Sequence, residues 1–185
     1  MKQITCLICI ILLVFAQSTV LAQDAKLTNI IVTNTRDDLL LFLTVAGAFK
    51  EKTEKAILSG VPATFSFYIN LSRSRSLWPD KSIASIKVTH TIKYNNLKKK
   101  FMVIRSWDNR KPVIISSFNE AKKLMTEIDS LKIVPLNWLE KGLRYQIQAK
   151  AELSKLTLPF YLHYVLFFVS LWDFETDWYT IDFIY

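Results

Sequence analysis

Three segments of the chain alternate strictly between apolar and polar side chains, and this pattern constrains the fold more than any other feature of the sequence. In residues 65–72, Phe65 and Phe67 are separated by Ser66, and the same period of two returns over residues 85–94 and 144–153. A period of two places the apolar residues on one face of a β-strand and the polar residues on the other. Strands with one buried and one solvated face are typical of antiparallel sheets.

Turn residues between the apolar runs predict how the strands connect. The pair Asn95-Asn96 separates the second alternating segment from an apolar run over residues 101–105, and asparagine tolerates the positive φ of a tight turn. We therefore expect a hairpin at this position. Two further strands are expected over residues 28–33 and 39–45, joined through the charged residues 36–38.

Two helices are expected among the strands. Within residues 49–59, Glu51 lies four residues before Lys55, and Gly60 followed by Pro62 is a stop signal. The second helix begins after Ser117, which forms a capping box with Glu120. Its apolar stripe consists of Phe118, Ala121, Leu124, Met125 and Ile128.

An apolar helix stripe needs a sheet face to cover. The expected fold class is therefore mainly β (α+β), with an antiparallel sheet or β-sandwich and two helices packed against it.

The first 22 residues have the form of a secretory signal peptide. Lys2 precedes an apolar run, and Val20 and Ala22 are small residues placed as before a cleavage site. An uncleaved anchor is the alternative interpretation of this segment. Cleavage removes Cys6, Cys9 and one lysine, so the net charge falls from +8 to +7. We expect residues 23–185 to form a single β-rich domain, exported to the periplasm or another part of the cell envelope.

Several spaced motifs resemble one exported bacterial family. They are SGVPATFSFYINL with WPD shortly after it, IKYNNL, SFNEAKKLM and the closing LPFYLHYVLFFVSLWDFETDWYTIDF. Together they resemble the family called domain of unknown function 4390 (DUF4390). The resemblance implies a secreted or periplasmic single domain with no assigned activity, in an envelope-signalling context, because members are encoded near membrane sensor kinases. The motifs carry Gly60, Pro62, Trp78, Asp80, Tyr94, Leu97, Pro159, Trp172 and Trp178, and the resemblance assigns no role to any of them.

Catalytic machinery is sparse in this sequence. After residue 22 there is no cysteine, and no serine lies in a G-x-S-x-G turn. His90 falls on the apolar side of its strand and His163 lies among aromatic and aliphatic residues, so a structural role is favoured for both over a ligand or acid–base role. Phosphate-binding glycine loops and zinc-ligand spacings are absent from the sequence. We therefore expect a binding domain rather than an enzyme, with no cofactor and no metal.

The segment WDFETDW holds the densest acidic cluster. Asp173, Glu175 and Asp177 are spaced by two, so in an extended chain they share one face, and Trp172, Phe174, Thr176 and Trp178 share the other. The favoured interpretation is a turn between strands whose acids pair with basic side chains. The alternatives are a site for a hard cation such as calcium, and hydrolysis of a sugar stacked on tryptophan.

Basic charge is concentrated in residues 73–111, which hold eleven basic and two acidic side chains. In an exported protein this charge favours an anionic membrane or cell-wall surface, or an acidic envelope protein, and disfavours nucleic acid. The alternative is a solvated sheet face. The sequence identifies no small-molecule ligand. The candidate contact residues are Arg73, Arg75, Trp78, Lys98, Lys99 and Lys100.

The run LPFYLHYVLFFVSLW, residues 158–172, has no charged side chain. Extended to the nearest charges it reaches 17 residues, which as a helix spans ~26 Å against a hydrocarbon core of ~30 Å. The acids that follow it contradict the positive-inside bias expected of a membrane span. We favour a buried part of the sheet core, with one face available to a partner.

These features predict an exported, non-catalytic binding domain that contacts a membrane surface or an envelope signalling partner. One alternative is a small outer-membrane β-barrel, because residues 179–185 alternate and end in an aromatic residue. The other is a hydrolase or cation-binding domain that uses Asp173, Glu175 and Asp177.

Overall fold

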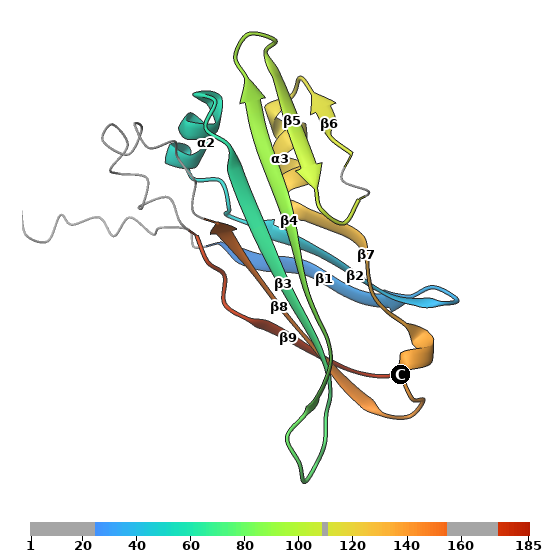
Figure 1. Ribbon diagram of the computed structural model, residues 1–185. Helices are drawn as coiled ribbons and strands as arrows, with labels where there is room; N and C mark the ends of the chain where they lie inside the picture. The colour runs from blue at the N-terminus through green and yellow to red at the C-terminus, as the bar shows by residue number, and fades with distance from the viewer. Residues whose placement is uncertain (1–24, 109–110, 155–173) are drawn as a thin grey trace, which may run out of the picture.

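The structure is a computed structural model that describes residues 25–108, 111–154 and 174–185. The described strands form two antiparallel sheets, with the orders β1-β2-β7 and β6-β5-β4-β3-β8-β9 (Figure 1). This arrangement confirms the mainly-β prediction with two helices. The elements are β1 (Lys26–Asn34), β2 (Asp38–Ala46), α2 (Glu51–Leu58), β3 (Ala63–Arg73), β4 (Lys81–Asn95), β5 (Lys100–Arg105), β6 (Val113–Ile115), α3 (Phe118–Thr126), β7 (Glu127–Pro135), the 3-10 helix η1 (Leu136–Trp138), β8 (Arg144–Ser154) and β9 (Tyr179–Ile184).

The three alternating segments become β3, β4 and β8, which lie side by side at the centre of the larger sheet. Phe67 on β3 has Val88 and Ala151 as its partners on β4 and β8. All three side chains are buried, because matched alternation puts the apolar positions of neighbouring strands on the same face. The predicted hairpin between β4 and β5 also forms, with Asn95 paired to Lys100.

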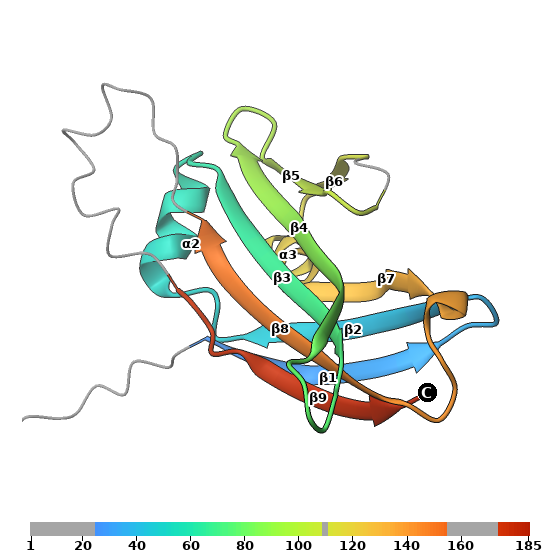
Figure 2. The same cartoon turned by 60° about the horizontal axis from the view of Figure 1, so that its bottom comes forward.

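The smaller sheet covers the apolar face of the larger one, and its strands run across those of the larger sheet (Figure 2). Leu41 and Leu43 of β2 are buried in the same core as Phe65 and Ile69 of β3. The core therefore lies between the two sheets, and the polar face of the larger sheet is turned outward.

Both predicted helices are present and both close the core at one end of the molecule (Figure 1). The Ser117 hydroxyl accepts a hydrogen bond from the Glu120 N–H at 3.4 Å, as the capping box predicts. Phe49 precedes α2 and Phe118 is the first residue of α3. Their rings pack edge to face with centroids 6.2 Å apart. Gly60 follows α2 with φ of +92°, which glycine adopts without steric cost.

The predicted extent of the second helix was wrong. Ile128 does not extend the stripe of α3, because the helix ends at Thr126 and Ile128 lies buried in β7. β7 itself was not predicted, because Ser130 has a positive φ of 57° and the pairing with β2 shifts register twice. These irregularities interrupt the period of two by which strands are recognised.

Three sequence predictions fall outside the described residues: the signal peptide over residues 1–22, the uncharged run 158–172 with His163, and Asp173. Within the part of the chain that the structure describes, no helix combines the length and the apolar character needed to cross a membrane.

Candidate contact surface at the β3–β4 hairpin

The six candidate contact residues lie at opposite ends of β4. Arg73, Arg75 and Trp78 lie at or near the β3–β4 loop, and Lys98–Lys100 lie at the β4–β5 turn. β4 has 15 residues and is therefore about 50 Å long at the usual rise of a strand. Figure 1 shows the two loops projecting in opposite directions. The structure thus divides the basic region into two separate surfaces.

We call residues 73–81 the hairpin end, and its backbone is held at the base. Arg73 and Lys81 are the last paired residues of β3 and β4. The Ser74 N–H donates to the Arg144 carbonyl on β8 at 3.0 Å, and the Arg75 N–H donates to Asp80 Oδ1 at 3.1 Å. An aspartate that accepts a backbone N–H stabilises a turn. The loop therefore projects from a base fixed on two strands.

Apolar side chains occupy the outermost part of the hairpin end. Leu77 is 91% exposed and Trp78 is 74% exposed. Pro79 follows directly and fixes its own backbone φ. Leu77 and Trp78 are adjacent in the sequence and neither is buried in the core, and exposed apolar patches are typical of contact surfaces.

Basic residues flank these apolar side chains in the sequence. Arg75 and Lys81 are exposed and take part in none of the ion pairs of the described residues. Arg73 is different, because its Nη1 lies 2.8 Å from Glu140 Oε1. The one acidic side chain of the loop, Asp80, accepts the Arg75 N–H. The hairpin end therefore offers an indole and a leucine side chain beside unpaired positive charge.

Two hollows in the described part of the chain are lined by residues of the hairpin end, and a third lies elsewhere. A hollow of 430 Å³ is lined by residues 73–78 with Leu143, and a second of 270 Å³ shares Arg73 with it. The third, of 520 Å³, lies between the β1–β2 turn and η1. The sequence did not single out Leu77, Trp138 and Glu140, which lie at this end, because no periodicity marks them.

The β4–β5 turn at the other end is tighter and has no aromatic side chain. Asn95 Oδ1 accepts the N–H groups of Leu97 and Lys98 at 3.1 and 2.9 Å, and Lys99 has a φ of 52°. Leu97 is 96% exposed, and the three lysines that follow are exposed as well. This surface is basic, with a single apolar side chain.

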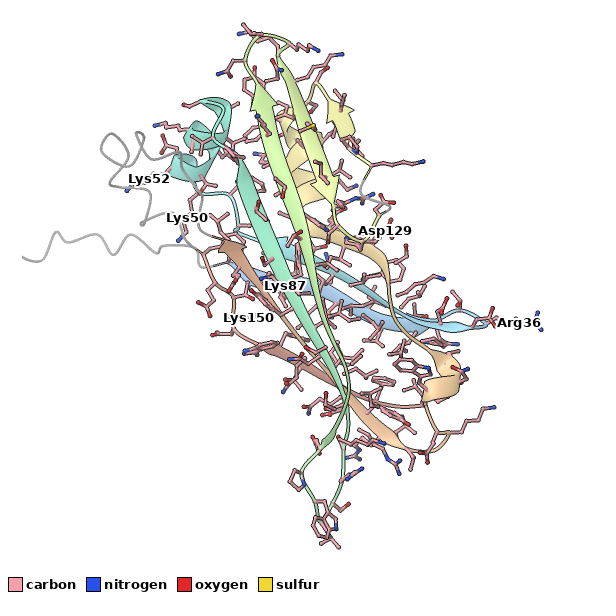
Figure 3. All side chains as sticks on the ribbon, viewed as in Figure 1. Arg36, Lys50, Lys52, Lys87, Asp129 and Lys150 are labelled. Carbon is pink, nitrogen blue, oxygen red and sulfur yellow. The ribbon has the colours of Figure 1, made fainter. Side chains whose placement is uncertain are left out.

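The polar face of the larger sheet carries cations that already have neighbours. Lys87 on β4 and Lys150 on β8 lie on this outward face (Figure 3). Lys87 Nζ lies 4.8 Å from the ring centroid of Tyr68, and a hydrogen bond to Tyr68 raises the pKa of Lys87. The Tyr68 hydroxyl in turn donates to Glu152 Oε1 at 2.7 Å. These charges belong to a solvated sheet face.

The acidic segment is only partly as expected. Phe174 and Thr176 are buried while Glu175 and Asp177 are exposed, but Trp178 is 47% exposed and breaks the alternation. Glu175 forms an ion pair with Lys150, and its hydrogen bond raises the pKa of Lys150. Among the described residues, no three His, Cys, Asp or Glu side chains are grouped as metal ligands. The cation hypothesis remains a prediction, because Asp173 lies outside these residues.

His90 is buried and both of its ring nitrogens are hydrogen-bonded. Nδ1 lies 3.0 Å from the Met125 carbonyl, and the Trp107 Nε1–H donates to Nε2 at 2.8 Å. Nδ1 therefore carries the proton of a neutral imidazole. Burial lowers the pKa of His90 from 6.5 to about 4, and the nearby Arg105 acts in the same direction, against the hydrogen bond to Met125. This geometry suits the structural role expected for His90.

Comparison with known proteins agrees with the sequence motifs. The family model described as a domain of unknown function (DUF4390) matches residues 22–182. No curated protein and no solved structure matches the chain. Because the family match covers nearly the whole chain, including both sheets and the hairpin end, the protein belongs to the DUF4390 family.

Proposed function

We propose that this protein is an exported, non-catalytic binding domain that attaches to an anionic membrane surface through its hairpin end. The observation that carries the proposal is the position of Leu77 and Trp78. They project beyond the last paired residues of a long hairpin and are flanked by the unpaired cations Arg75 and Lys81. The predicted signal peptide supports the exported location.

The chemistry of these side chains matches the boundary between water and lipid. Tryptophan is enriched at membrane interfaces, because its ring is apolar and its N–H remains hydrogen-bonded. Burial of Leu77 and Trp78 would contribute about 4 kcal/mol. Arg75 and Lys81 would contribute about 2 kcal/mol beside anionic headgroups. The total resembles the affinity of a single myristoyl chain, so we infer reversible attachment.

The loop geometry supports insertion without a change of fold. The hydrogen bonds of Ser74 and Arg75 fix the base of the loop in the free protein. Binding therefore costs little ordering of the chain, and more of the contact energy appears as affinity.

The test is co-sedimentation with lipid vesicles. It uses the purified protein with its N-terminus as the cell processes it. One set of vesicles contains phosphatidylglycerol and phosphatidylcholine, and the other contains phosphatidylcholine alone. The double variant Leu77→Ser with Trp78→Ser should bind the anionic vesicles at least ~100-fold more weakly, because it loses the apolar part of the contact. The control is Leu97→Ser, which removes an equally exposed leucine from the opposite turn and should leave binding unchanged.

Equal binding by the double variant and the control would reject the proposal. The proposal also fails if the unaltered protein binds neither kind of vesicle. If an acidic envelope protein binds the hairpin end while no vesicle does, the surface has a protein partner instead of a lipid one.

A further inference from the structure

We infer that the hollow beside the hairpin end is a binding pocket for a zwitterionic lipid headgroup, a phosphodiester that carries a primary ammonium group. This inference rests on the proposed function: the hairpin end attaches to an anionic membrane, and the pocket beside it would hold one zwitterionic headgroup of that same membrane. We call the hollow the Trp138 pocket. It has a volume of 270 Å³ and its polar and aromatic lining is Arg73, Lys81, Ser82, Trp138, Glu140 and Tyr145.

The pocket is built from four separate parts of the fold that are fixed against each other. Arg73 ends β3, Lys81 begins β4, Trp138 ends η1, and Tyr145 comes from β8. Arg73 has both Lys81 and Tyr145 as partners in the sheet. Sheet pairing therefore fixes the backbone of Arg73, Lys81 and Tyr145 in the absence of a ligand.

Tyr145 holds the acidic side of the pocket in place. Its side chain is 1% exposed, and its ring stacks on Phe183 with centroids 5.8 Å apart. The hydroxyl accepts the Glu140 N–H at 2.7 Å. A buried ring thus anchors the loop that carries Glu140, and the Glu140 carboxylate reaches Arg73 at 2.8 Å.

The lining presents both signs of charge beside an aromatic side chain. Arg73 and Lys81 are donors suited to a phosphate, and Ser82 adds a hydroxyl. The Glu140 carboxylate and the 60% exposed Trp138 indole are suited to an ammonium group. A phosphate alone would leave Glu140 facing an anion. Glu140 pairs with Arg73 through Oε1, so a phosphate joined to an ammonium by a short spacer would place the ammonium at the second carboxylate oxygen, Oε2, and the phosphate at Arg73 and Lys81.

Position also favours a headgroup. Arg73 lines both this pocket and the hollow along the hairpin end. Leu77 is four residues further along the chain, so it lies at most ~14 Å from Arg73. When Leu77 and Trp78 reach the acyl boundary, the pocket lies among the headgroups. Its volume is smaller than that of most drug-sized sites and suits a small polar group.

The experiment uses soluble headgroups, so that it does not depend on membrane insertion. Glycerophosphoethanolamine is titrated against the ¹⁵N-labelled protein, and the indole N–H resonance of Trp138 is followed after assignment with Trp138→Phe. Glycerophosphoglycerol is the matched probe, because it has the same phosphodiester with a hydroxyl in place of the ammonium. We expect a saturable shift with glycerophosphoethanolamine and at least ~5-fold weaker binding of glycerophosphoglycerol.

Two variants test which pocket residue binds the ammonium and which binds the phosphate of the headgroup. Glu140→Gln should abolish the preference between the two probes, and Lys81→Ala should weaken both by ~10-fold. The control Lys93→Ala removes an exposed lysine from the far part of β4 and should change neither.

Equal affinity for the two probes, or no saturable shift at Trp138, would overturn the inference. In that case vesicle binding that still depends on Leu77 and Trp78 would leave the proposed function intact. If instead the headgroup preference is found but vesicle binding does not depend on these two residues, the membrane proposal fails and the pocket stands.

Discussion

The two ends of β4 are alike in composition and different in construction. Both are exposed and basic, and each carries at least one leucine that is more than 90% exposed. The β4–β5 turn is a short loop closed by Asn95 and followed by three lysines. The hairpin end is longer, its backbone is hydrogen-bonded to β8 and to the Asp80 side chain, and it adds an indole and two hollows that its own residues line.

This difference shows why charge alone does not locate a contact surface. Lysines in water attract any anionic surface over a Debye length of about 8 Å at physiological salt, and they do so without geometry. An apolar pair fixed beside cations adds energy that salt does not screen. The hairpin end should therefore dominate binding, although Lys98–Lys100 are the densest run of basic residues in the sequence.

The largest expected effect comes from reversing charge at one end and then at the other. Arg75→Glu with Lys81→Glu should weaken binding to phosphatidylglycerol vesicles by about 4 kcal/mol at low salt, because two attractions become repulsions. Lys98→Glu with Lys99→Glu should change the lipid dissociation constant less than ~3-fold. Co-sedimentation over a range of salt concentrations measures both. Equal losses at the two ends would show that the protein responds to net charge only.

The next effect concerns the strand that connects the two ends. His90 has a pKa of about 4 in the folded chain against 6.5 for an ordinary histidine. Between these pH values the unfolded chain binds a proton that the folded chain does not, so stability falls as pH decreases from 6.5 to 4 and is complete above 6.5. The expected loss is about 3 kcal/mol.

Urea denaturation at several pH values measures this slope. His90→Gln removes the titrating ring and should flatten the curve over the same window. If the free energy of unfolding of His90→Gln depends on pH as steeply as that of the unaltered protein, the titration belongs to other groups.

A smaller effect should appear when the β4–β5 turn is given the aromatic side chain that it lacks. Leu97→Trp should add about 1 kcal/mol of vesicle affinity, because a larger apolar side chain is exposed beside three lysines. The two ends point in opposite directions, so this variant should also join vesicles together. The turbidity of a vesicle suspension measures this joining of vesicles. The control is Thr91→Trp, which places a tryptophan on the sheet face instead of at the turn. No rise in turbidity would mean that an exposed tryptophan beside lysines is not sufficient.

The smallest effect comes from releasing the loop. Asp80→Ala removes the acceptor of the Arg75 N–H and should weaken vesicle binding by less than about 1 kcal/mol, because the loop must then be ordered on binding. It also removes a negative charge, which alone would strengthen binding, so Asp80→Asn serves as the comparison that removes charge and retains an acceptor. Binding at least as strong for Asp80→Ala as for Asp80→Asn would show that the hydrogen bond does not position the loop.

Much of the fold could be predicted from the sequence, because the relevant signals are local. Alternation identified β3, β4 and β8, the asparagine pair identified the β4–β5 hairpin, and Ser117 with Glu120 identified the start of α3. β7 was missed for a physical reason. Its bulges around Ser130 remove the period of two, and its strand conformation depends on pairing with β2.

The candidate site was predictable only in part. Arg73, Arg75 and Trp78 were named from charge and aromatic content, and the structure places them at one end. Trp138 and Glu140 could not be joined to them, because they are distant in sequence and meet Arg73 only through the pairing of β3 with β8.

The sequence by itself determined the period of the central strands, the caps of the helices, the family and the basic character of residues 73–111. Each of these depends on neighbouring residues or on composition. Only the tertiary structure decided that the basic residues separate to the two ends of β4 and that Met125 and Trp107 are the hydrogen-bond partners of His90. It also decided that a pocket forms beside the hairpin end. A strand about 50 Å long separates in space charges that belong to one stretch of the sequence. Sheet pairing, in contrast, brings residues that are distant in the sequence into contact.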